Sequence, residues 1–201
     1  MITTTKQTDI YALKEACAIT GATWGRFNLA GIRNTDRADS WNDVIIAAND
    51  EIMLMCKATT DPGKKGTDTS VKGVAHMVEG FHKNAWGLGW HGGKDKWWKH
   101  EAFIQVASVP YWRDVDRDGN LSGADKIITD DPPSGLNIHS VVGDIPASVG
   151  GWSLGCQVVM HMTEFLKILA MAKKSGGPLF SYNLMRLKSE TKYLYNMVHQ
   201  G

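Results

Sequence analysis

The sequence has few of the features that define a specialised class of protein. Its 201 residues include three cysteines, Cys17, Cys56 and Cys156, an odd and widely spaced set that does not predict a disulfide framework. No apolar run approaches the ~20 residues that span a bilayer. The 22 basic and 21 acidic residues give a net charge of +1. We therefore expect no nucleic-acid partner and no membrane insertion.

The N-terminus also lacks the pattern of an export signal. Residues 1–17 contain no basic segment followed by a continuous apolar stretch. We therefore expect a chain made in the cytoplasm, with reduced cysteines. The length predicts a monomer of one domain, 1–201. Within it we expect an N-terminal helix and loop decoration over 1–40, a β-rich core over 41–188 and a tail over 189–201.

The apolar periodicity predicts an α+β fold in which strands predominate. Asn49-Asp50 separates two short apolar runs, which is typical of a β-hairpin. The expected helices cover 9–20 and 163–174, the second nearly buried, and the expected strands cover 44–48, 52–56, 74–78, 103–109 and 180–187. The polar segment 64–73 is expected to be a loop. Arg33, Asp36, Arg37 and Asp39 are expected in a surface loop with local ion pairs.

Residues 80–100 contain four tryptophans and three histidines among five glycines. Such aromatic rings stack on sugars or peptide planes, or else fill a small β core. We favour a core or loop-anchoring role for most of them. His91, within Gly-Trp-His-Gly-Gly, is a candidate wall residue of a binding site. His82 and His100 neighbour lysines and are expected at the surface.

The most informative stretch runs from Gly135 to Cys156. His139 follows a short apolar segment, and Cys156 follows a Ser-x-Gly turn 17 positions later. A thiolate nucleophile needs a base for its proton and donors for the oxyanion that it creates. We predict that His139 is the base and Cys156 the nucleophile, with Gly155 letting backbone amides approach the oxyanion. The alternative is that both side chains are buried structural groups, as cysteine often is.

Cys17 and Cys56 lack such a context. Cys17 falls on the expected helix over 9–20, and Cys56 ends an apolar run. We expect both to be core thiols.

The motif resembles the signature of the L,D-transpeptidase (YkuD-type) catalytic domain. In that family a histidine followed by a small residue precedes a Ser-His-Gly-Cys turn. Here His139-Ser140 and Ser153-Leu154-Gly155-Cys156 correspond to these parts, and residues 60–63, Thr-Asp-Pro-Gly, correspond to an upstream Thr-Pro-x-Gly turn. The resemblance spans roughly residues 43 to 170.

The chain departs from this family pattern at two places. Leu154 replaces the second histidine of the motif. Gln157 and Val158 stand where the family has an apolar residue followed by Arg or Asn. These departures affect the positions that recognise a substrate carboxylate.

The resemblance implies a predominantly β L,D-transpeptidase-like core, an N-terminal helix and a buried helix after the cysteine. It implies acyl transfer through a Cys156 thioester, with His139 oriented by the main-chain carbonyl of Ser140. The oxyanion hole would come from the amides of Gly155 and Cys156. We expect the pairing to lower the pKa of Cys156 well below ~8.5.

We expect His91, Trp152 and Ser153 to contact the substrate. The expected partner is bacterial peptidoglycan. The departures and the missing export signal favour a phage endolysin-like hydrolase that is made in the cytoplasm and acts on the cell wall after release. The alternatives are an L,D-transpeptidase or carboxypeptidase of wall remodelling, and a non-catalytic wall-binding module. Catalysis of this kind requires no cofactor.

A second motif lies in residues 114–125. Its residues fall at positions 1, 3, 5, 6, 7 and 12 of a calcium-binding loop, which needs alternating oxygen ligands and a glycine at the sharp turn. The predicted ligands are Asp114, Asp116, Asp118, Asn120 and Asp125, with Gly119 at the turn. The final Asp resembles the dockerin-type variant of this loop. We predict a structural Ca²⁺, and the alternative is an acidic surface loop.

Overall fold

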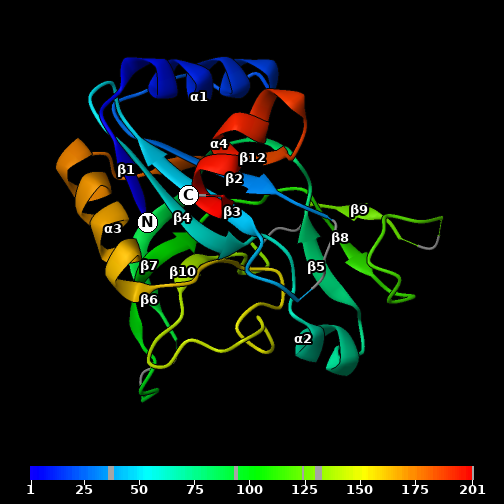
Figure 1. The fold of residues 1–201 in the computed structure, drawn as a ribbon. Coiled ribbons are helices and arrows are strands. Elements are labelled where there is room, and N and C mark those ends of the chain that lie inside the picture. Colours follow the sequence, from blue (N-terminus) through cyan, green and yellow to red (C-terminus); the bar gives the residue numbers. More distant parts are fainter. Residues whose placement is uncertain (36–38, 93–94, 124, 130–132, 201) are drawn as a thin grey trace.

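A computed structural model describes residues 1–35, 39–92, 95–123, 125–129 and 133–200, and its largest unit is a barrel of eight strands (Figure 1). These strands are β2 (Asn28–Arg33), β3 (Asp43–Ala48), β4 (Met53–Thr59), β6 (Gly80–His91), β7 (His100–Gln105), β10 (Ile138–Ser140), β11 (Gln157–Val159) and β12 (Phe180–Arg186). They follow one another in the order β4-β11-β10-β7-β6-β12-β2-β3, and β3 pairs with β4 to close the barrel. Most neighbours are antiparallel, whereas β10–β11 and β2–β12 are parallel.

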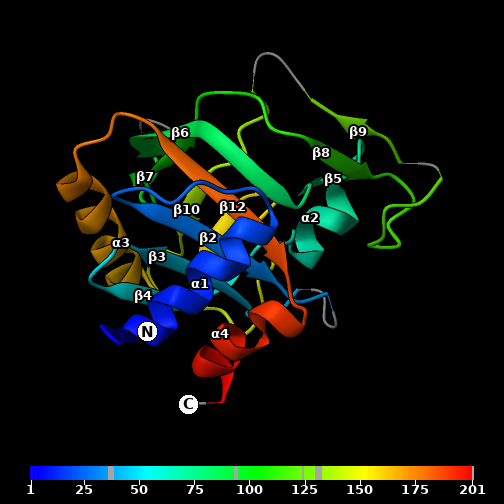
Figure 2. The ribbon, with the colours of Figure 1, turned by 90° about the horizontal axis from the view of Figure 1, so that it is seen from above.

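Shorter elements surround the barrel. β1 (Ile2–Thr4) pairs with the first half of β4. A separate sheet consists of β5 (Val74–Met77), β8 (Tyr111–Asp114) and β9 (Ile127–Ile128). The helices are α1 (Gln7–Ile19), α2 (Lys64–Thr69), α3 (Met162–Ser175) and α4 (Ser189–His199). Figures 1 and 2 show α1 and α4 together over one side of the barrel, while α3 packs against β4, β10 and β11. In the described part of the chain, none of the helices has the length and apolar character that crossing a bilayer demands.

Strand β3 shows why its sequence is continuously apolar. Val44 and Ile46 belong to the cluster that α1 and α4 cover, and Ile45 and Ala47 belong to the core that contains Trp86. Because successive side chains point to opposite faces of a strand, a strand covered on both faces is apolar at every position. The protein therefore has two cores that share the wall of the barrel.

The α+β class with predominant strands is confirmed, and so are the two expected helices and the β3–β4 hairpin. The assignment of residues 1–40 to a decoration does not describe the structure, because β2 lies inside the barrel between β12 and β3. The expected tail contains α4, and the expected loop over 64–73 contains α2. The helix α3 is only partly buried, because Leu166 is 52% exposed.

Arg33 is buried, so its expected place in a surface loop is wrong. Its guanidinium donates to the carbonyl oxygens of Thr60 (2.8 Å) and Met77 (2.9 Å), and its Nε lies 3.1 Å from Oδ1 of Asp61. These contacts fix the turn that follows β4 to the barrel wall. Asp36 and Arg37 lie outside the described residues. Asp39 accepts hydrogen bonds through Oδ1 from the N–H groups of residues 64 and 150.

Cys17 and Cys56 are both buried, as expected of core thiols. Burial raises the pKa of each thiol above its ordinary value, which keeps both in the neutral form at neutral pH. Neither thiol has the surroundings of a reactive cysteine.

Candidate active site

Two parallel strands bring His139 and Cys156 together. His139 lies in β10, and Cys156 directly precedes β11. The register pairs His139 with Val158, and the N–H of Gln157 donates to the carbonyl of Asn137 at 2.9 Å. Adjacent strands lie about 4.8 Å apart, and side chains two positions apart share a face. Cys156 therefore shares a face with His139, because Val158 pairs with His139 and lies two positions after the cysteine.

The His139 imidazole is buried and held by one nitrogen. Its Nδ1 lies 3.1 Å from the carbonyl oxygen of Ser140, so Nδ1 carries the proton and donates it. Its Nε2 is buried and has no hydrogen-bond partner among the described residues. Burial, with His91 as a further cause, lowers the pKa of His139 to about 3, so the ring is neutral with a free lone pair on Nε2. An unpartnered buried nitrogen is costly and is a common mark of a catalytic group.

The hydrogen bonds around Ser140 extend to His100. The N–H of Ser140 donates to Nε2 of His100 at 3.3 Å, and Nδ1 of His100 donates to the carbonyl of Trp98 at 2.8 Å. His100 thereby positions the peptide whose carbonyl orients His139. His100 is buried, so the expectation of a surface residue is wrong, and the same holds for His82. A neighbouring lysine does not predict that a histidine is exposed, because successive side chains of a strand point to opposite faces.

His91 forms the wall next to His139. The two imidazoles stack, with ring centroids 3.9 Å apart and planes inclined by 15°. Asn137 accepts from the N–H of Gln105 through Oδ1 (2.9 Å), which leaves its Nδ2 to donate to Nδ1 of His91 (3.1 Å). Burial, followed by the effect of His100, lowers the pKa of His91 to about 4, so this ring is also neutral. The structure thus places the predicted wall residue in contact with the predicted base.

The environment of Cys156 differs from the expected one. Burial raises the pKa of its thiol to about 11, although a hydrogen bond from the Asn137 main chain offsets this in part. The thiol donates weakly to the carbonyl of Gly135, with 3.6 Å between sulfur and oxygen. The expected low pKa is therefore wrong for the resting protein. The neutral His139 imidazole supplies no positive charge that would lower the pKa of the thiol.

The turn before Cys156 is held by its own hydroxyl. The Ser153 side chain donates to the carbonyl of Cys156 (2.8 Å) and accepts from the N–H of Gly155 (3.2 Å). Gly155 has φ +137°, and a Cβ there would lie 2.6 Å from the carbonyl oxygen of Ala75. Only glycine fits such a position. The Ser153 hydroxyl is thus engaged in hydrogen bonds within the turn and not, as we expected, directed at a substrate. The Gly155 N–H already donates to that hydroxyl, which corrects the expected role of Gly155 in the oxyanion hole.

Cys156, Trp152 and Ser140 complete the set of predicted site residues. The Cys156 N–H has no hydrogen-bond partner within the described ranges, so it remains a candidate oxyanion donor. Trp152 is half-buried, and its main chain lies close enough to His139 to raise the pKa of that ring slightly against the effect of burial. Ser140 is buried, and its hydroxyl donates to the carbonyl of Val159 at 2.9 Å.

Gln157 explains one departure from the transpeptidase pattern. Its side-chain amide donates to the carbonyls of Thr60 (3.3 Å) and Gly155 (3.2 Å), and its Oε1 accepts from the Tyr182 hydroxyl (3.2 Å). An apolar residue at position 157 would remove this partner from the Gly155 carbonyl and from the Tyr182 hydroxyl, whereas the Thr60 carbonyl would keep its hydrogen bond from Arg33. Gln157 ties the cysteine turn to the inside of the barrel. Its neighbour Val158 is also buried and offers no charge to a substrate carboxylate.

Exposed tryptophans stand near this site. Of the four tryptophans in 80–100, Trp86 fills the core, whereas Trp90 and Trp97 are 66% and 75% exposed and so do not lie in the core. The Trp97 ring lies against Gly143 in the segment between β10 and β11. Trp98 lies beside His91, with ring centroids 5.6 Å apart. Of these rings, Trp98 is the one that the contacts place next to an imidazole of the site.

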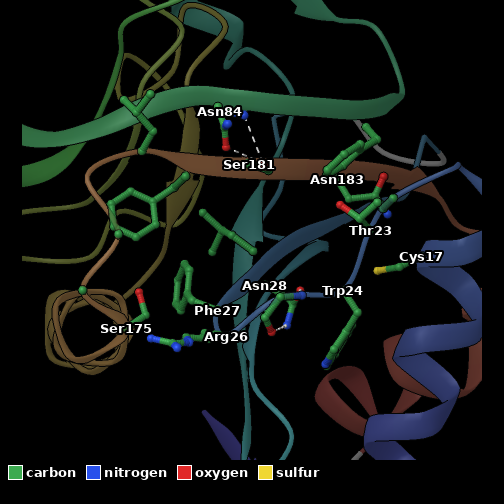
Figure 3. Close-up of a pocket in the computed structure, with 18 residues that line it drawn as sticks. Cys17, Thr23, Trp24, Arg26, Phe27, Asn28, Asn84, Ser175, Ser181 and Asn183 are labelled. Atoms are coloured by element: carbon green, nitrogen blue, oxygen red, sulfur yellow. Dashed lines mark hydrogen bonds between the residues drawn. The ribbon is translucent and has the colours of Figure 1, made fainter.

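Two of the cavities in the described part of the chain lie away from these residues. The one in Figure 3, of about 420 Å³, lies between the end of α1, the end of α3, β6 and β12 and is lined by Trp24, Arg26 and Asn183 among others. The second, of about 650 Å³, is lined by His76, Trp112 and part of the acidic loop. Neither cavity is lined by His139 or Cys156. The buried amide nitrogen of Asn183 points to the Cys17 thiol rather than to an open ligand site.

The predicted metal ligands lie apart from the imidazoles, in the loop between β8 and β9. Ligand atoms of Asp114, Asp116 and Asp118 lie within 4.8 Å of one another. Asp125 accepts from the N–H groups of Val115 and Ser122 and so closes the loop.

Comparisons with known proteins give no relative for this chain. No protein-family model matches the sequence, and neither a curated protein nor a solved structure matches it. The transpeptidase resemblance therefore remains an expectation based on His139, Ser140 and the turn before Cys156.

Proposed function

We propose that the protein is a cysteine hydrolase that cleaves amide bonds in the peptides of bacterial peptidoglycan. The single observation that carries this proposal is the buried, unpartnered Nε2 of His139, on the same face as Cys156. The neighbouring His100 uses both ring nitrogens in hydrogen bonds, whereas His139 uses Nδ1 alone among the described residues. A general base keeps one nitrogen free and has the other held by an acceptor.

The reaction has two halves. The Cys156 sulfur attacks the amide carbonyl carbon while its proton passes to Nε2 of His139. The carbon–nitrogen bond then breaks, the leaving amine takes the proton from His139, and a thioester remains on the sulfur. Water attacks the thioester, gives a proton to His139 and releases the carboxylate, and the proton returns to the thiolate. The Cys156 N–H stabilises the oxyanion in both halves.

The protonation states decide how the nucleophile is activated. A thiol with a pKa of about 11 next to an imidazole with a pKa of about 3 rests as a neutral pair. The proton therefore leaves the sulfur during the attack, not before it, so that His139 acts as a general base. This differs from cysteine enzymes with a stable thiolate–imidazolium pair.

The substrate class rests on the resemblance and on the surface beside the site. Trp97 offers an exposed ring, and His91 forms a neutral wall against His139. Rings of this kind stack on sugars and on peptide planes. Val158 occupies the position of the Arg or Asn of the transpeptidase motif, so the carboxylate contact of that family is missing. Hydrolysis is therefore favoured over transpeptidation.

The proposal is tested by mass spectrometry of purified sacculi after incubation with the protein. Three proteins are compared: the unchanged chain, Cys156→Ala, and Cys17→Ala as a control that removes a thiol elsewhere. Each is first shown to be folded by circular dichroism. We expect new cleaved muropeptides with the unchanged chain and with Cys17→Ala, and none with Cys156→Ala. The mass of the products names the bond that is cut.

Other outcomes separate the alternatives. Products joined to an added amino acid acceptor would indicate an L,D-transpeptidase. Binding to sacculi without turnover, unchanged in Cys156→Ala, would indicate a wall-binding module that uses its exposed tryptophans. Full activity in Cys156→Ala would refute the cysteine mechanism.

A further inference from the structure

The acidic loop between β8 and β9 concentrates negative charge in a small volume. Ligand atoms of Asp114, Asp116 and Asp118 lie within 4.8 Å of one another, and none of the three carboxylates takes part in an ion pair between described residues. The guanidinium groups of Arg113 and Arg117 donate instead to the carbonyls of residues 73 and 70. The charge of the cluster is thus not compensated by the neighbouring arginines.

Asp114 provides a second, independent observation that points to a cation. Its side chain is only 1% exposed. Its Oδ2 accepts from the N–H of Gly119 across the loop at 3.1 Å, which directs the carboxylate into the loop. Its Oδ1 is buried and has no hydrogen-bond partner in the described part of the chain. A buried carboxylate oxygen without a partner costs stability, and a cation at this place removes that cost.

The rest of the loop has the form that a hard cation requires. Gly119 has φ +75°, which allows the chain to turn sharply between the carboxylates. Asp125 is tied back to the start of the loop by the N–H of Val115 at 3.1 Å. Its oxygens keep lone pairs for a cation. With Asn120, the loop offers carboxylate and carbonyl oxygens on alternating residues.

We propose that this loop binds a divalent cation of the size of Ca²⁺, held by oxygens of Asp114, Asp116, Asp118, Asn120 and Asp125. Ca²⁺ takes six to eight oxygen ligands in flexible geometry, whereas Mg²⁺ demands a compact octahedron and keeps its waters. A loop of twelve residues with several carboxylates suits the larger ion. This proposal does not depend on the proposed function.

The position of the loop gives the cation a structural role. Asp114 pairs with Val74 of β5. Ala75, which follows Val74 in β5, donates its N–H to the carbonyl of Leu154 at 3.2 Å. Leu154 belongs to the turn that carries Cys156. The cation therefore stabilises the strand pair behind the cysteine turn, and Asp114 and Asp118 also line the cavity of about 650 Å³.

The experiment uses the full chain after treatment with chelator. Tb³⁺ replaces Ca²⁺ at oxygen sites and emits when an excited tryptophan lies nearby, and Trp112 stands two residues before Asp114. We expect saturable, tryptophan-sensitised Tb³⁺ emission that Ca²⁺ displaces and equal concentrations of Mg²⁺ do not. We also expect Ca²⁺ to raise the melting temperature, because a ligand that binds only the folded state stabilises it.

Variants distinguish this site from general acidity of the surface. The double variant Asp116→Asn/Asp118→Asn changes exposed side chains only, so we expect it to fold. We expect its affinity for the cation, measured by the Tb³⁺ emission and by the thermal shift, to fall at least tenfold. Asp144→Asn removes one exposed carboxylate outside the loop and should keep both signals. Trp112→Phe should lose most of the Tb³⁺ emission and keep the thermal shift. Emission and thermal shift that are absent from the unchanged chain, or equal in the double variant and in Asp144→Asn, would overturn the proposal.

Discussion

The imidazole of His91 stacks on that of His139, with centroids 3.9 Å apart. Two neutral rings fit at this distance, whereas two charged rings would repel each other in a site largely shielded from water. The pairing therefore links the protonation of one histidine to that of the other.

The burial of these two imidazoles predicts an acid-labile fold. The pKa of His139 is about 3 and that of His91 about 4, whereas both are near 6.5 in the unfolded chain. Below pH 6.5 the unfolded state binds protons that the folded state excludes, so the free energy of unfolding falls as the pH drops towards 4. The expected slope is roughly 1 kcal/mol per pH unit for each histidine. Urea denaturation at several pH values measures it, and His91→Gln/His139→Gln should flatten the curve.

Alkylation of Cys156 should be slow at neutral pH and should accelerate up to high pH. The thiolate is the reactive form, and the pKa of this thiol is about 11. We expect the rate with iodoacetamide to rise about tenfold per pH unit between pH 7 and 10. Mass spectrometry of the peptide that contains Cys156 separates this rate from those of the buried thiols. A plateau reached below pH 8 would contradict the neutral pair and indicate a thiolate–imidazolium pair.

Replacing His100 should impair catalysis without removing any reacting group. In His100→Leu, the N–H of Ser140 loses its acceptor, and the carbonyl that orients His139 is less firmly held. We expect kcat to fall about 10- to 100-fold with little change in KM. His82→Leu is the matched control, because His82 is a buried histidine that bonds only to the carbonyl of Val78. An equal loss of kcat in both variants would assign the effect to general destabilisation.

Trp97 should contribute to substrate binding. Its ring is 75% exposed, so Trp97→Ala leaves the core intact, and we expect KM to rise about 3- to 10-fold with kcat unchanged. Trp90→Ala is the control on the same hairpin. Trp90 is adjacent to His91 in β6, so it faces away from the imidazoles. Equal effects of both substitutions on KM would argue against a stacking site at Trp97.

Replacing Gly155 should destabilise the turn that carries Cys156. Gly155→Ala requires a strained φ and places Cβ against the carbonyl of Ala75, so we expect a loss of stability of about 1–3 kcal/mol or more. Gly123→Ala is the control, because an added Cβ meets no atom within 4 Å there. Thermal denaturation of the two variants compares the effects. A Gly155→Ala protein as stable as the control would show that the turn adapts at low cost.

The sequence predicts the parts of the fold that depend on neighbouring residues. Helices α1 and α3 follow from the spacing of apolar side chains, and Asn49-Asp50 marks the turn of the β3–β4 hairpin. The motif predicts that His139 and Cys156 act together, and the parallel pairing of β10 with β11 places Val158, two residues after Cys156, opposite His139.

Other properties of the site depend on contacts between distant segments. His100 accepts a hydrogen bond from the N–H of Ser140, 40 residues further along the chain. The residues around His100 in the sequence do not predict this contact. The pKa of Cys156 depends on how far the chain around Gly135 covers the sulfur. The Gly155 N–H cannot serve in the oxyanion hole, because it already donates to the hydroxyl of Ser153, two residues earlier.

The position of β12 has a consequence for biosynthesis. This strand is inserted between β6 and β2, and its tyrosine holds Gln157 behind the cysteine turn. Every group proposed to react is synthesised before residues 180–186, yet the barrel cannot close without them. The nucleophile and the base therefore belong to an unfinished wall until β12 has been synthesised and has joined β6 and β2.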